Sequence, residues 1–538
     1  MENILKKKEI IFFLIIFIIG TIIFKDFGIS IDEDNSRING FVSLNYIFEL
    51  FQINFNYKID GITLPKINNF DEQGNGVMFD LPLAFIEYFF NINNFRDQFL
   101  LRHFSTFIIF FISLIYFYKL IFYHYKNQYL AFIGVLMIFL SPRIFGESFY
   151  NSKDIVFLSL NIISIYYSVI FLDQKSKKNL LLFIIFSSIA TGVRIIGLFV
   201  PIIVLLVMFL SFFRNKETLK NDFIYFIGIL LLLPIFITLF WPYLWSNPIN
   251  NFISAFNILS NHYRPINNFF LGEYQSSFYV DWYYILVWIG ITIPITYIFL
   301  FLIGLCKLII RLKNRLYKLN ANIPLNDLYR GNKELKNIIY FLNFFIPLFT
   351  VIIFHSTLYT GWRHLYFIYP PIIMISLYGI YSLKFALKKN LKYVYLFIII
   401  SFIQNSYWIY KNHPFQYLYF NFFVSGNFDK NFDMDYWGVS NYNTLDTIAK
   451  LENKTVSVGL IGDGDLILAH KFLREKNKKK IIFTDNFIEA DYLIDNFNRW
   501  NGIKKTKNDE IINKNFQVFY EQKIGNIVFS RIYKNTLN

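Results

Sequence analysis

Long apolar segments separated by short polar loops occupy the first three quarters of the chain. A helix that crosses a membrane needs about 20 mostly apolar residues, and about eleven stretches approach this requirement. They are residues 9–25, 100–122, 128–142, 154–172, 179–193, 195–213, 222–241, 282–306, 337–355, 364–383 and 392–410. The pattern predicts a polytopic α-helical membrane protein in which residues 1–410 form about eleven transmembrane helices.

The loop that follows the first apolar segment, residues 26–99, contains two more apolar stretches. In "INGFVSLNYIFELF" and in "VMFDLPLAFIEYFFNI" the apolar residues recur every three or four positions, which is the spacing of one helix face. Such helices lie in the membrane interface when a polar face opposes the apolar one. We therefore expect two interfacial helices, joined by the turn-rich stretch "NNFDEQGNG".

The pattern changes after residue 410. The segments "KTVSVGLI", "KKIIFTD", "ADYLIDNF" and "GNIVFSRIYK" alternate or are rich in branched residues, which is typical of strands, and "DLILAHKFLREKN" has helical spacing. Residues 411–538 are therefore predicted to be an outer segment and a small α/β domain.

The charged residues give the expected orientation. The chain has 538 residues, of which 55% are hydrophobic, and a formal net charge of +15. The basic residues gather in alternate loops, at 123–127, 173–178, 214–221, 307–336 and 384–391. Because cytoplasmic loops collect Lys and Arg, the N-terminus is predicted to be cytoplasmic and the C-terminal domain extracytoplasmic. The positive charge is then topological, which disfavours a nucleic-acid partner. Cys306 is the only cysteine, so no intrachain disulfide is possible.

Three consecutive carboxylates, Asp32, Glu33 and Asp34, follow the first apolar segment. One interpretation is structural: Asp32 caps the following helix, and Glu33 and Asp34 meet its positive end. The other is catalytic, because a positioned carboxylate can take a proton from an attacking hydroxyl group. The two interpretations are compatible, since a cap also fixes a carboxylate in place.

A second outer loop, "SPRIFGESFYNSKD", contains Arg143, Glu147, Lys153 and Asp154. Charges so close to lipid are costly unless they are paired or functional. They could snorkel at the interface around a helix start at Lys153 and Asp154. Alternatively, the cations hold a phosphate group while Asp154 orients them or binds substrate.

Further cations and histidines fall on the same predicted face. Arg194, in "TGVRIIG", lies at the turn between two apolar segments. His262 and Arg264 lie in "NHYRP", and Arg363 and His364 in "TGWRHLYFIYPP". The neighbouring Trp and Tyr residues are typical of an aromatic belt, and the histidines could equally be interfacial polar residues.

No metalloprotease, P-loop or dinucleotide-binding motif is present in the sequence. The stretch "GDGD" at 462–465 lacks the remaining ligands of an EF-hand and is predicted to be a turn between strand and helix. The sequence thus specifies no cofactor and leaves a divalent metal open.

One face of the predicted membrane domain therefore gathers carboxylates, Arg, Lys and His from several loops. This surface suits a sugar linked to a polyprenyl phosphate: the tail lies among apolar helices, basic residues hold the phosphate and an acid meets the acceptor hydroxyl. Phosphate is an acceptable leaving group, so no nucleotide site is required.

The ordered set of outer-face motifs resembles a known class of enzymes. Asp32-Glu33, "SPRIFGESFYNSKD", Arg194, "TGWRHLYFIYPP", "HPFQYLYFN" and "DYWGVSNYNTLD" occur in turn. They are similar to motifs of the GT-C membrane glycosyltransferases, specifically the dolichyl-phosphate-mannose protein mannosyltransferase-like group (glycosyltransferase family 39 and its bacterial relatives). The resemblance covers most of residues 1–450.

The resemblance implies inverting transfer of a sugar from a polyprenyl-phosphate donor to a glycan, lipid or protein acceptor on the outer side of a bacterial plasma membrane. It implies Asp32 or Glu33 as the catalytic carboxylate and places Asp154 and Lys153 in the second-loop site. The residues implied at the donor phosphate are Arg143, Arg194, His262, Arg264, Arg363 and His364. The chain lacks the repeat pattern of a β-trefoil domain, so protein O-mannosylation does not follow.

Two rival functions come from other classes of protein. A multi-pass transporter or flippase of lipid-linked saccharide would have a similar hydropathy pattern, but transporters place binding groups near the bilayer midplane. The polar groups here gather at one face, which favours the enzyme. The other rival is a scaffold whose outer α/β domain binds a partner.

Overall fold

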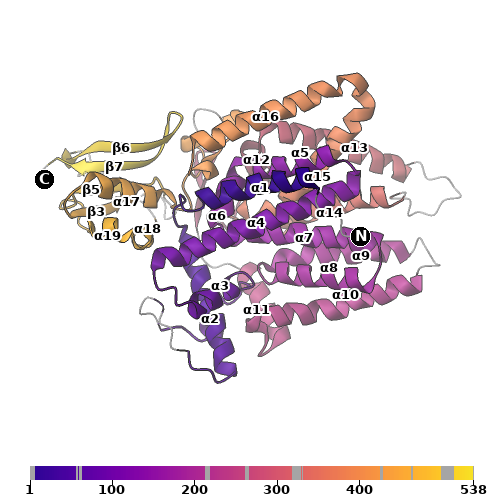
Figure 1. Ribbon diagram of the computed structural model, residues 1–538, viewed down its shortest axis with the longest axis horizontal. Helices are drawn as coiled ribbons and strands as arrows, with labels where there is room; N and C mark the ends of the chain where they lie inside the picture. Colours follow the sequence, from indigo (N-terminus) through magenta and orange to yellow (C-terminus); the bar gives the residue numbers. More distant parts are fainter. Residues whose placement is uncertain are drawn as a thin grey trace.

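The computed structural model describes residues 6–55, 59, 63–212, 219–260, 266–317, 329, 331–424, 428–461, 464–498 and 514–536. Long helices run side by side in a bundle, and a small sheet domain stands at one end of it (Figure 1). The bundle helices are α1 (Lys7–Ile23), α4 (Phe95–Tyr125), α5 (Gln128–Phe139), α6 (Pro142–Tyr150), α7 (Asp154–Asp173), α8 (Lys177–Thr191), α9 (Phe199–Phe212), α10 (Leu219–Phe240), α12 (Tyr284–Thr292), α13 (Ile295–Tyr317), α14 (Gly331–Ile353), α15 (Tyr369–Leu387) and α16 (Leu391–Lys411).

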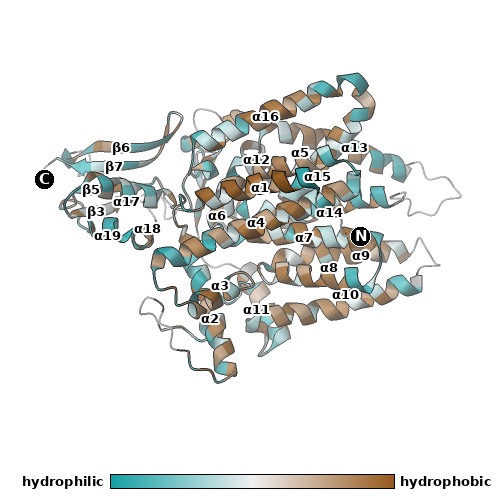
Figure 2. Cartoon of the chain, viewed as in Figure 1, coloured by the Kyte–Doolittle hydropathy of each residue, from teal (hydrophilic) through white to brown (hydrophobic). Residues whose placement is uncertain are grey.

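The bundle is that of an integral membrane protein. Within the described residues, seven helical segments are long and apolar enough to span a membrane, or eight if the bent pair α5–α6 counts as one span. Apolar side chains dominate the helices along their length (Figure 2). The polytopic helical fold that the apolar pattern predicts is confirmed, and every predicted apolar segment coincides with a helix or a pair of helices.

One predicted span is broken. The apolar stretch 282–306 forms two helices, α12 and α13, because Pro294 interrupts it. Proline has no N–H group and disfavours helical geometry at the residue before it. Ile293 is accordingly extended, with φ −87° and ψ 141°. A second break separates α5 from α6, where the chain bends by 67° before Pro142.

The long first loop forms two helices across the end of the bundle. Helix α2 (Ile31–Leu50) runs transverse to the bundle helices and packs against α3 (Asp80–Phe89) (Figure 1). Helix α2 begins at Ile31, seven positions before the predicted stretch, so the acid triplet forms its first turn. Shorter elements around this end are α11 (Pro248–Ser260), the strands β1 (Asn267–Phe270) and β2 (Glu273–Ser276), and the 3-10 helices η1 (Ile67–Asn69), η2 (Ile195–Leu198), η3 (Pro242–Leu244), η4 (Arg363–Ile368), η6 (Gln416–Leu418), η7 (Phe422–Val424) and η8 (Phe428–Lys430). The 3-10 helix η5 (Lys388–Asn390) lies at the opposite end, between α15 and α16.

The sheet domain has five strands in the order β4-β3-β5-β7-β6, with β3 parallel to β4 and β5 and the remaining pairs antiparallel. The four predicted strands are present, and the predicted helix 465–477 forms two short helices. Strand β6 has no strict alternation and is an element that the pattern does not predict. The elements are α17 (Ser440–Leu451), β3 (Val456–Ile461), α18 (Leu466–Phe472), α19 (Glu475–Lys478), β4 (Ile481–Phe483), β5 (Tyr492–Asp495), β6 (Phe516–Ile524) and β7 (Ile527–Asn535).

The sheet domain shares its hydrophobic core with the bundle. Ile29, just before α2, and Phe99, in α4, are buried in one cluster with Leu445, Val458 and other residues of the domain. The predicted division at residue 410 falls at the end of α16, but residues such as Tyr417 and Trp437 still belong to the core of the bundle. The α/β unit itself begins at α17.

The two ends of the bundle differ in what they carry. The sheet domain and α2 lie at one end, and the C-terminal ends of α9, α13 and α15, which precede the basic loops, lie at the other (Figure 1). The sequence pattern places the candidate catalytic and binding residues in the loops opposite the basic ones. They are therefore expected at the end of the bundle that carries the sheet domain.

Candidate active site

A cavity of about 900 Å³ lies at the end of the bundle that carries α2. One part of its wall is polar and is formed by side chains from five separate segments: Asp32, Asn35, Glu72, Asn75, Lys153, Arg194, Arg363 and His364. Another part is apolar and comes mainly from η2, α9 and α14: Ile195, Ile196, Phe199, Pro347, Val351 and Phe354. The cavity therefore joins a charged surface to an apolar channel wall.

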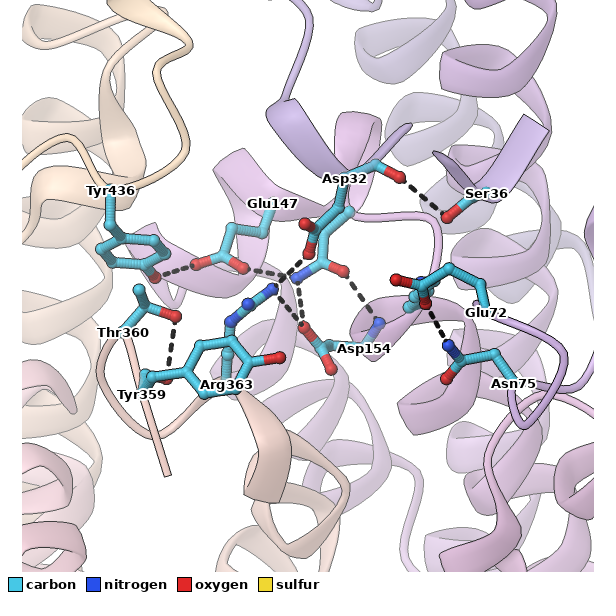
Figure 3. A network of polar contacts seen from close by, with 12 residues as sticks. Asp32, Ser36, Glu72, Asn75, Glu147, Asp154, Tyr359, Thr360, Arg363 and Tyr436 are labelled. Atoms are coloured by element: carbon cyan, nitrogen blue, oxygen red, sulfur yellow. Dashed lines mark hydrogen bonds and ion pairs between the residues drawn. The ribbon is translucent and has the colours of Figure 1, made fainter. Parts of the chain in front are cut away.

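Arg363 lies between two carboxylates in the polar wall. Its Nη1 atom donates to Asp32 Oδ2 at 2.8 Å and lies 3.7 Å from Asp154 Oδ2. Arg194 also donates to Asp154. Figure 3 shows Asp32 and Asp154 facing Arg363 from different elements of the fold. Four of the predicted site residues thus form one alternating chain of charges, Asp32–Arg363–Asp154–Arg194.

The first turn of α2 separates Asp32 from Glu33. Successive residues of an α-helix point about 100° apart, so adjacent acids face different surroundings. Glu33 accepts a hydrogen bond of 2.8 Å from the Ser30 backbone N–H, and its Oε1 lies 3.0 Å from His103 Nε2. The Glu33 side chain is 1% exposed, whereas 34% of Asp32 is exposed.

These contacts correct the structural interpretation of the acid triplet. Glu33, rather than Asp32, binds the backbone at the start of the helix, and Asp32 projects into the cavity. Glu33 does not line the cavity. Its contacts with Ser30 and His103 fix the first turn on which Asp32 stands.

Asp32 is held in its ionised form. Burial by itself would raise the pKa of its carboxyl group, but the positive charges of Arg363, Lys153 and Arg194 outweigh burial and lower the pKa below its usual value. The group is therefore an acceptor of hydrogen bonds and protons at neutral pH.

A β-hairpin supports the loop that carries Arg363. Asn268 of β1 accepts a hydrogen bond of 2.9 Å from the Thr360 N–H and donates one of 2.8 Å to the Leu358 carbonyl. Gly361, with φ +78°, occupies the left-handed region, which only glycine adopts without strain. Arg363 then begins η4 with its guanidinium against the ring of Trp437, 4.3 Å from the ring centre.

The second predicted loop forms α6 and the start of α7. Asn151 donates to Glu147 Oε2 at 2.7 Å and to Asp154 Oδ2 at 3.1 Å, and its Oδ1 accepts from the Asp154 N–H at 2.8 Å. Tyr436 donates to Glu147 Oε1 at 3.1 Å (Figure 3), and Tyr366 donates to the same atom at 2.7 Å. This buried network fixes Asp154, whose side chain is only 1% exposed.

Arg143 faces elsewhere. Its Nε donates to the Tyr419 carbonyl at 2.8 Å, and its guanidinium lies over the rings of Phe420 and Trp288. Arg143 is buried and is not among the residues that line the cavity. The structure thus does not bring this predicted phosphate ligand together with Arg194 and Arg363.

Another part of the polar wall contains Lys153 and Glu72, with 3.7 Å between Nζ and Oε2. Asn75 donates to Glu72, and Asn39 of α2 holds the same loop by donating to the Asn75 carbonyl at 3.2 Å. Sequence reasoning gave Glu72 and Asn75 only as part of a turn-rich loop. No local signal distinguishes these two residues, because their place in the cavity depends on the packing of that loop against Gly192, beside Arg194.

His364 also lines the cavity, and its ring meets that of Tyr359 edge to face with 4.6 Å between centres. Tyr359, Tyr436 and Trp437 are cavity residues that were not singled out individually, although "DYWG" was among the quoted motifs. His262 and Arg264 lie outside the described residues. Among the described residues, no group of three or more His, Cys, Asp or Glu side chains is arranged to hold a metal ion.

No protein-family model and no curated protein matches the sequence. Two solved structures of ArnT from Cupriavidus metallidurans are similar to the chain, each with 98% of both chains covered. The structure in the apo state has 9% sequence identity and a TM-score of 0.42. The structure bound to undecaprenyl phosphate has 8% identity and a TM-score of 0.44.

Proposed function

We propose that the chain is a glycosyltransferase that moves a sugar from a polyprenyl-phosphate-linked donor to an acceptor by inverting displacement. The observation that carries this proposal is the cavity of about 900 Å³, in which the acidic residues Asp32 and Glu72 and several cations adjoin an apolar wall. A sugar linked to a lipid phosphate has a reacting carbon, an anionic group and a long apolar tail. Each of these has a matching surface in the cavity.

Asp32 is the general base in this proposal. It is the more exposed of the two carboxylates that line the cavity, at 34% against 18% for Glu72, whereas Asp154 and Glu33 are each 1% exposed and held by several partners. As the acceptor oxygen bonds to the anomeric carbon, Asp32 takes the acceptor proton, and the bond from that carbon to the phosphate oxygen breaks. The lipid phosphate leaves with the electron pair, and attack opposite the leaving group inverts the configuration.

Arg194, Lys153, Arg363 and His364 are the proposed ligands of the donor phosphate. They approach the cavity from different segments, and charge-assisted hydrogen bonds to phosphate are stronger than neutral ones. Arg363 also contacts Asp32. A phosphate that draws Arg363 away would release the carboxylate for proton transfer, so the base becomes available when the donor is bound.

The apolar wall supplies the site for the polyprenyl chain. Phe199 of α9, Val351 of α14 and Phe354, just after α14, line the same cavity as the charged residues. Basic loops at the far end of the bundle support a cytoplasmic N-terminus. The sugar acceptor is then a glycan, lipid or protein on the extracytoplasmic side of a bacterial plasma membrane, and hexoses are the first donors to test.

The test uses the purified full chain in detergent with a panel of undecaprenyl-phosphate-linked hexoses and an envelope extract as acceptor. Transfer of labelled sugar into the extract, with release of undecaprenyl phosphate, is the expected result. Asp32→Asn is the inactive variant, and Lys392→Gln, on the peripheral helix α16, is the control with native activity.

The rival function predicts a different outcome. In sealed vesicles, a transporter would move lipid-linked sugar between leaflets without forming product. Translocation without product, unaffected by Asp32→Asn, would overturn the proposed enzyme. Product formed by native protein and lost in Asp32→Asn would exclude the transporter as the explanation of the cavity.

A further inference from the structure

The segment from Asp435 to Asn441 connects the sheet domain to the cavity. Tyr436 and Trp437 line the cavity, and Ser440 begins α17 of the sheet domain. The segment is thus at once a wall of the candidate site and the first part of the C-terminal unit. Contacts that hold this segment in place therefore also hold the cavity wall that Tyr436 and Trp437 form.

Asp435 is the centre of the hydrogen bonds that shape this segment. Its carboxylate accepts from the Tyr417 hydroxyl at 2.6 Å and from the backbone N–H groups of Val439 and Ser440 at 3.2 and 3.0 Å. Its backbone carbonyl accepts from the Gly438 N–H at 3.0 Å. Asp435 is fully buried, so these bonds are not exchanged for water, and the turn between Asp435 and Ser440 has one arrangement.

The sheet domain reaches this turn through Asn498, which follows β5. The Asn498 side-chain amide donates to the Asp435 carbonyl at 2.6 Å. Its backbone N–H is held by the side chain of Asn496, which also contacts Asn441 at 3.4 Å. All three asparagines are buried. The carboxyl-terminal end of β5 therefore holds the turn from the side of the domain.

The other side of the turn contacts Arg363 and the residue that precedes Asp32. The Trp437 carbonyl accepts from the Ile31 N–H at 3.2 Å, one residue before Asp32, and the Trp437 ring lies against the Arg363 guanidinium. Gly438 has φ +67°, and a Cβ at Gly28 would lie 2.4 Å from the Val439 carbonyl oxygen. The chain before α2 and the turn are therefore in direct backbone contact.

The hydrophobic core of the domain includes the same stretch. Ile29 is 2% exposed and packs in one cluster with Tyr442, Leu445 and Ile448 of α17. Asp32 follows Ile29 by three residues. The start of α2 is thus fixed by hydrogen bonding to the turn and by burial in the domain.

We propose that the C-terminal domain positions the catalytic ion pair, with Asn498 and Asp435 as positioning residues. Neither residue touches substrate. Asn498 orients the turn, the turn sets the Ile31 amide and the Trp437 ring, and these fix the spacing of Asp32 and Arg363. The catalytic part of this inference rests on the proposed function. The mechanical coupling between domain and α2 does not.

The coupling is tested by hydrogen–deuterium exchange on the full chain in detergent. Asn498→Ala removes the donor to Asp435, and exchange in the peptide covering residues 27–37 is expected to rise about tenfold or more because the Ile31 amide loses its fixed partner. Asn477→Ala is the matched control: it removes a buried asparagine that donates to Asp446 at 2.7 Å in the same domain, remote from the turn. It should leave that peptide unchanged.

A milder variant provides a second test in case Asn498→Ala does not fold. Tyr417→Phe keeps the ring and removes only the hydrogen bond to Asp435. If Asn498→Ala does not fold, the same rise in exchange is expected from Tyr417→Phe, with a smaller amplitude. Unchanged exchange at residues 27–37 in the folded variant overturns the coupling.

Kinetics separates positioning from simple stability. With a lipid-linked hexose that supports transfer in the panel assay, Asn498→Ala should lower kcat by about tenfold or more with little change in KM, since small misplacements of reacting groups slow chemistry. A fall in activity equal to that of Asn477→Ala at equal melting temperature overturns the positioning role. Absence of sugar transfer by the native chain overturns the proposed function, while the exchange experiment still decides the coupling.

Discussion

Both ends of the bundle carry arginines paired with acids, and the end with the sheet domain has a large cavity beside these charges. At the far end, Glu334 accepts hydrogen bonds from Arg311 and Arg315, the latter at 2.8 Å. The pocket there has a volume of about 10 Å³, which is room for about one water molecule. At the other end, Arg363 and its acids border a cavity of about 900 Å³.

The difference concerns exposure as well as space. The Arg311 side chain is 38% exposed and that of Arg363 is 6% exposed. A partly exposed ion pair contributes little to stability or chemistry because water screens it. Buried charges keep their strength and need a compensating partner. An arginine that is buried and still borders a large cavity is therefore the one suited to bind a charged substrate.

Removing the accessible carboxylate should have the largest effect. Asp32→Asn keeps the size of the side chain but abolishes proton acceptance, and we expect sugar transfer to fall by about 10²- to 10⁴-fold. Initial rates of transfer from the lipid-linked hexose measure this, with the melting temperature as the control for folding. A rate within about threefold of native would contradict the role of Asp32 as the base.

Removing a cation of the same wall should weaken donor binding. Arg194→Gln loses a charged donor near the cavity, and charge-assisted hydrogen bonds of this kind correspond to about a 10- to 100-fold change in affinity. Donor KM should rise by that factor more than kcat falls. An unchanged KM would remove Arg194 from the phosphate site.

The neighbouring acid should affect stability and leave chemistry nearly intact. Glu33→Ala removes the acceptor of the Ser30 N–H and the partner of His103. Loss of such a helix-end contact costs about 1–2 kcal/mol, so the melting temperature falls by a few degrees. Turnover per folded molecule should stay within a few-fold of native. A loss of turnover comparable with that of Asp32→Asn would instead assign catalysis to Glu33.

A buried carboxyl group outside the cavity should give the protein a pH-dependent stability. In α3, burial raises the pKa of Asp80 to about 7, although the charges of Arg102 and Lys153 oppose the rise. The folded state therefore holds the proton more tightly than the unfolded chain. The contribution of Asp80 to stability declines as the pH rises from about 4 to about 7, with roughly 1 kcal/mol lost between about pH 6 and about pH 8.

Melting curves at the two pH values measure this effect, with Asp80→Asn as the comparison. The variant cannot titrate at this position, so the fall in melting temperature between about pH 6 and about pH 8 should be smaller than in native protein. Equal falls in the two proteins would show that Asp80 titrates in its ordinary range.

The smallest effect is expected at the far end of the bundle. Glu334→Gln removes the acid shared by Arg311 and Arg315, but this cluster borders no substrate-sized space. Transfer rate and donor KM should stay within about twofold of native, because partly exposed pairs contribute about 0–1 kcal/mol. A loss as large as that of Arg194→Gln would contradict the conclusion that the far end takes no part in sugar transfer.

The membrane helices were predictable because their signal is local. Each apolar segment contains its own evidence, and the break at Pro294 could also have been deduced from proline chemistry. The role of Glu33 had a local signal too, since Ser30 and Glu33 match the S-x-x-E pattern of a helix start. That pattern would have assigned Glu33, rather than Asp32, to the backbone at the start of the helix.

The pairing within the site had no such signal. Asp32 and Arg363 are separated by 331 positions, and no periodicity links residues so far apart. The direction of Arg143, toward the Tyr419 carbonyl, likewise depends on tertiary packing. Sequence reasoning could therefore collect charged residues on one face, but it could not tell those that share a cavity from those that pack beside it.

The hydrogen bond between Ile31 and Trp437 also has a consequence for the order in which the protein is made. A chain synthesised from its N-terminus presents Asp32 early, whereas the turn that holds it, and Asn498 behind that turn, emerge near the end of translation. Contacts of such long range form late because closing the intervening loop costs entropy. The bundle can insert into the membrane helix by helix, yet its proposed active site is completed only after nearly the whole polypeptide has left the ribosome. A truncated product thus carries the proposed base, Asp32, but lacks the turn that contacts the start of its helix.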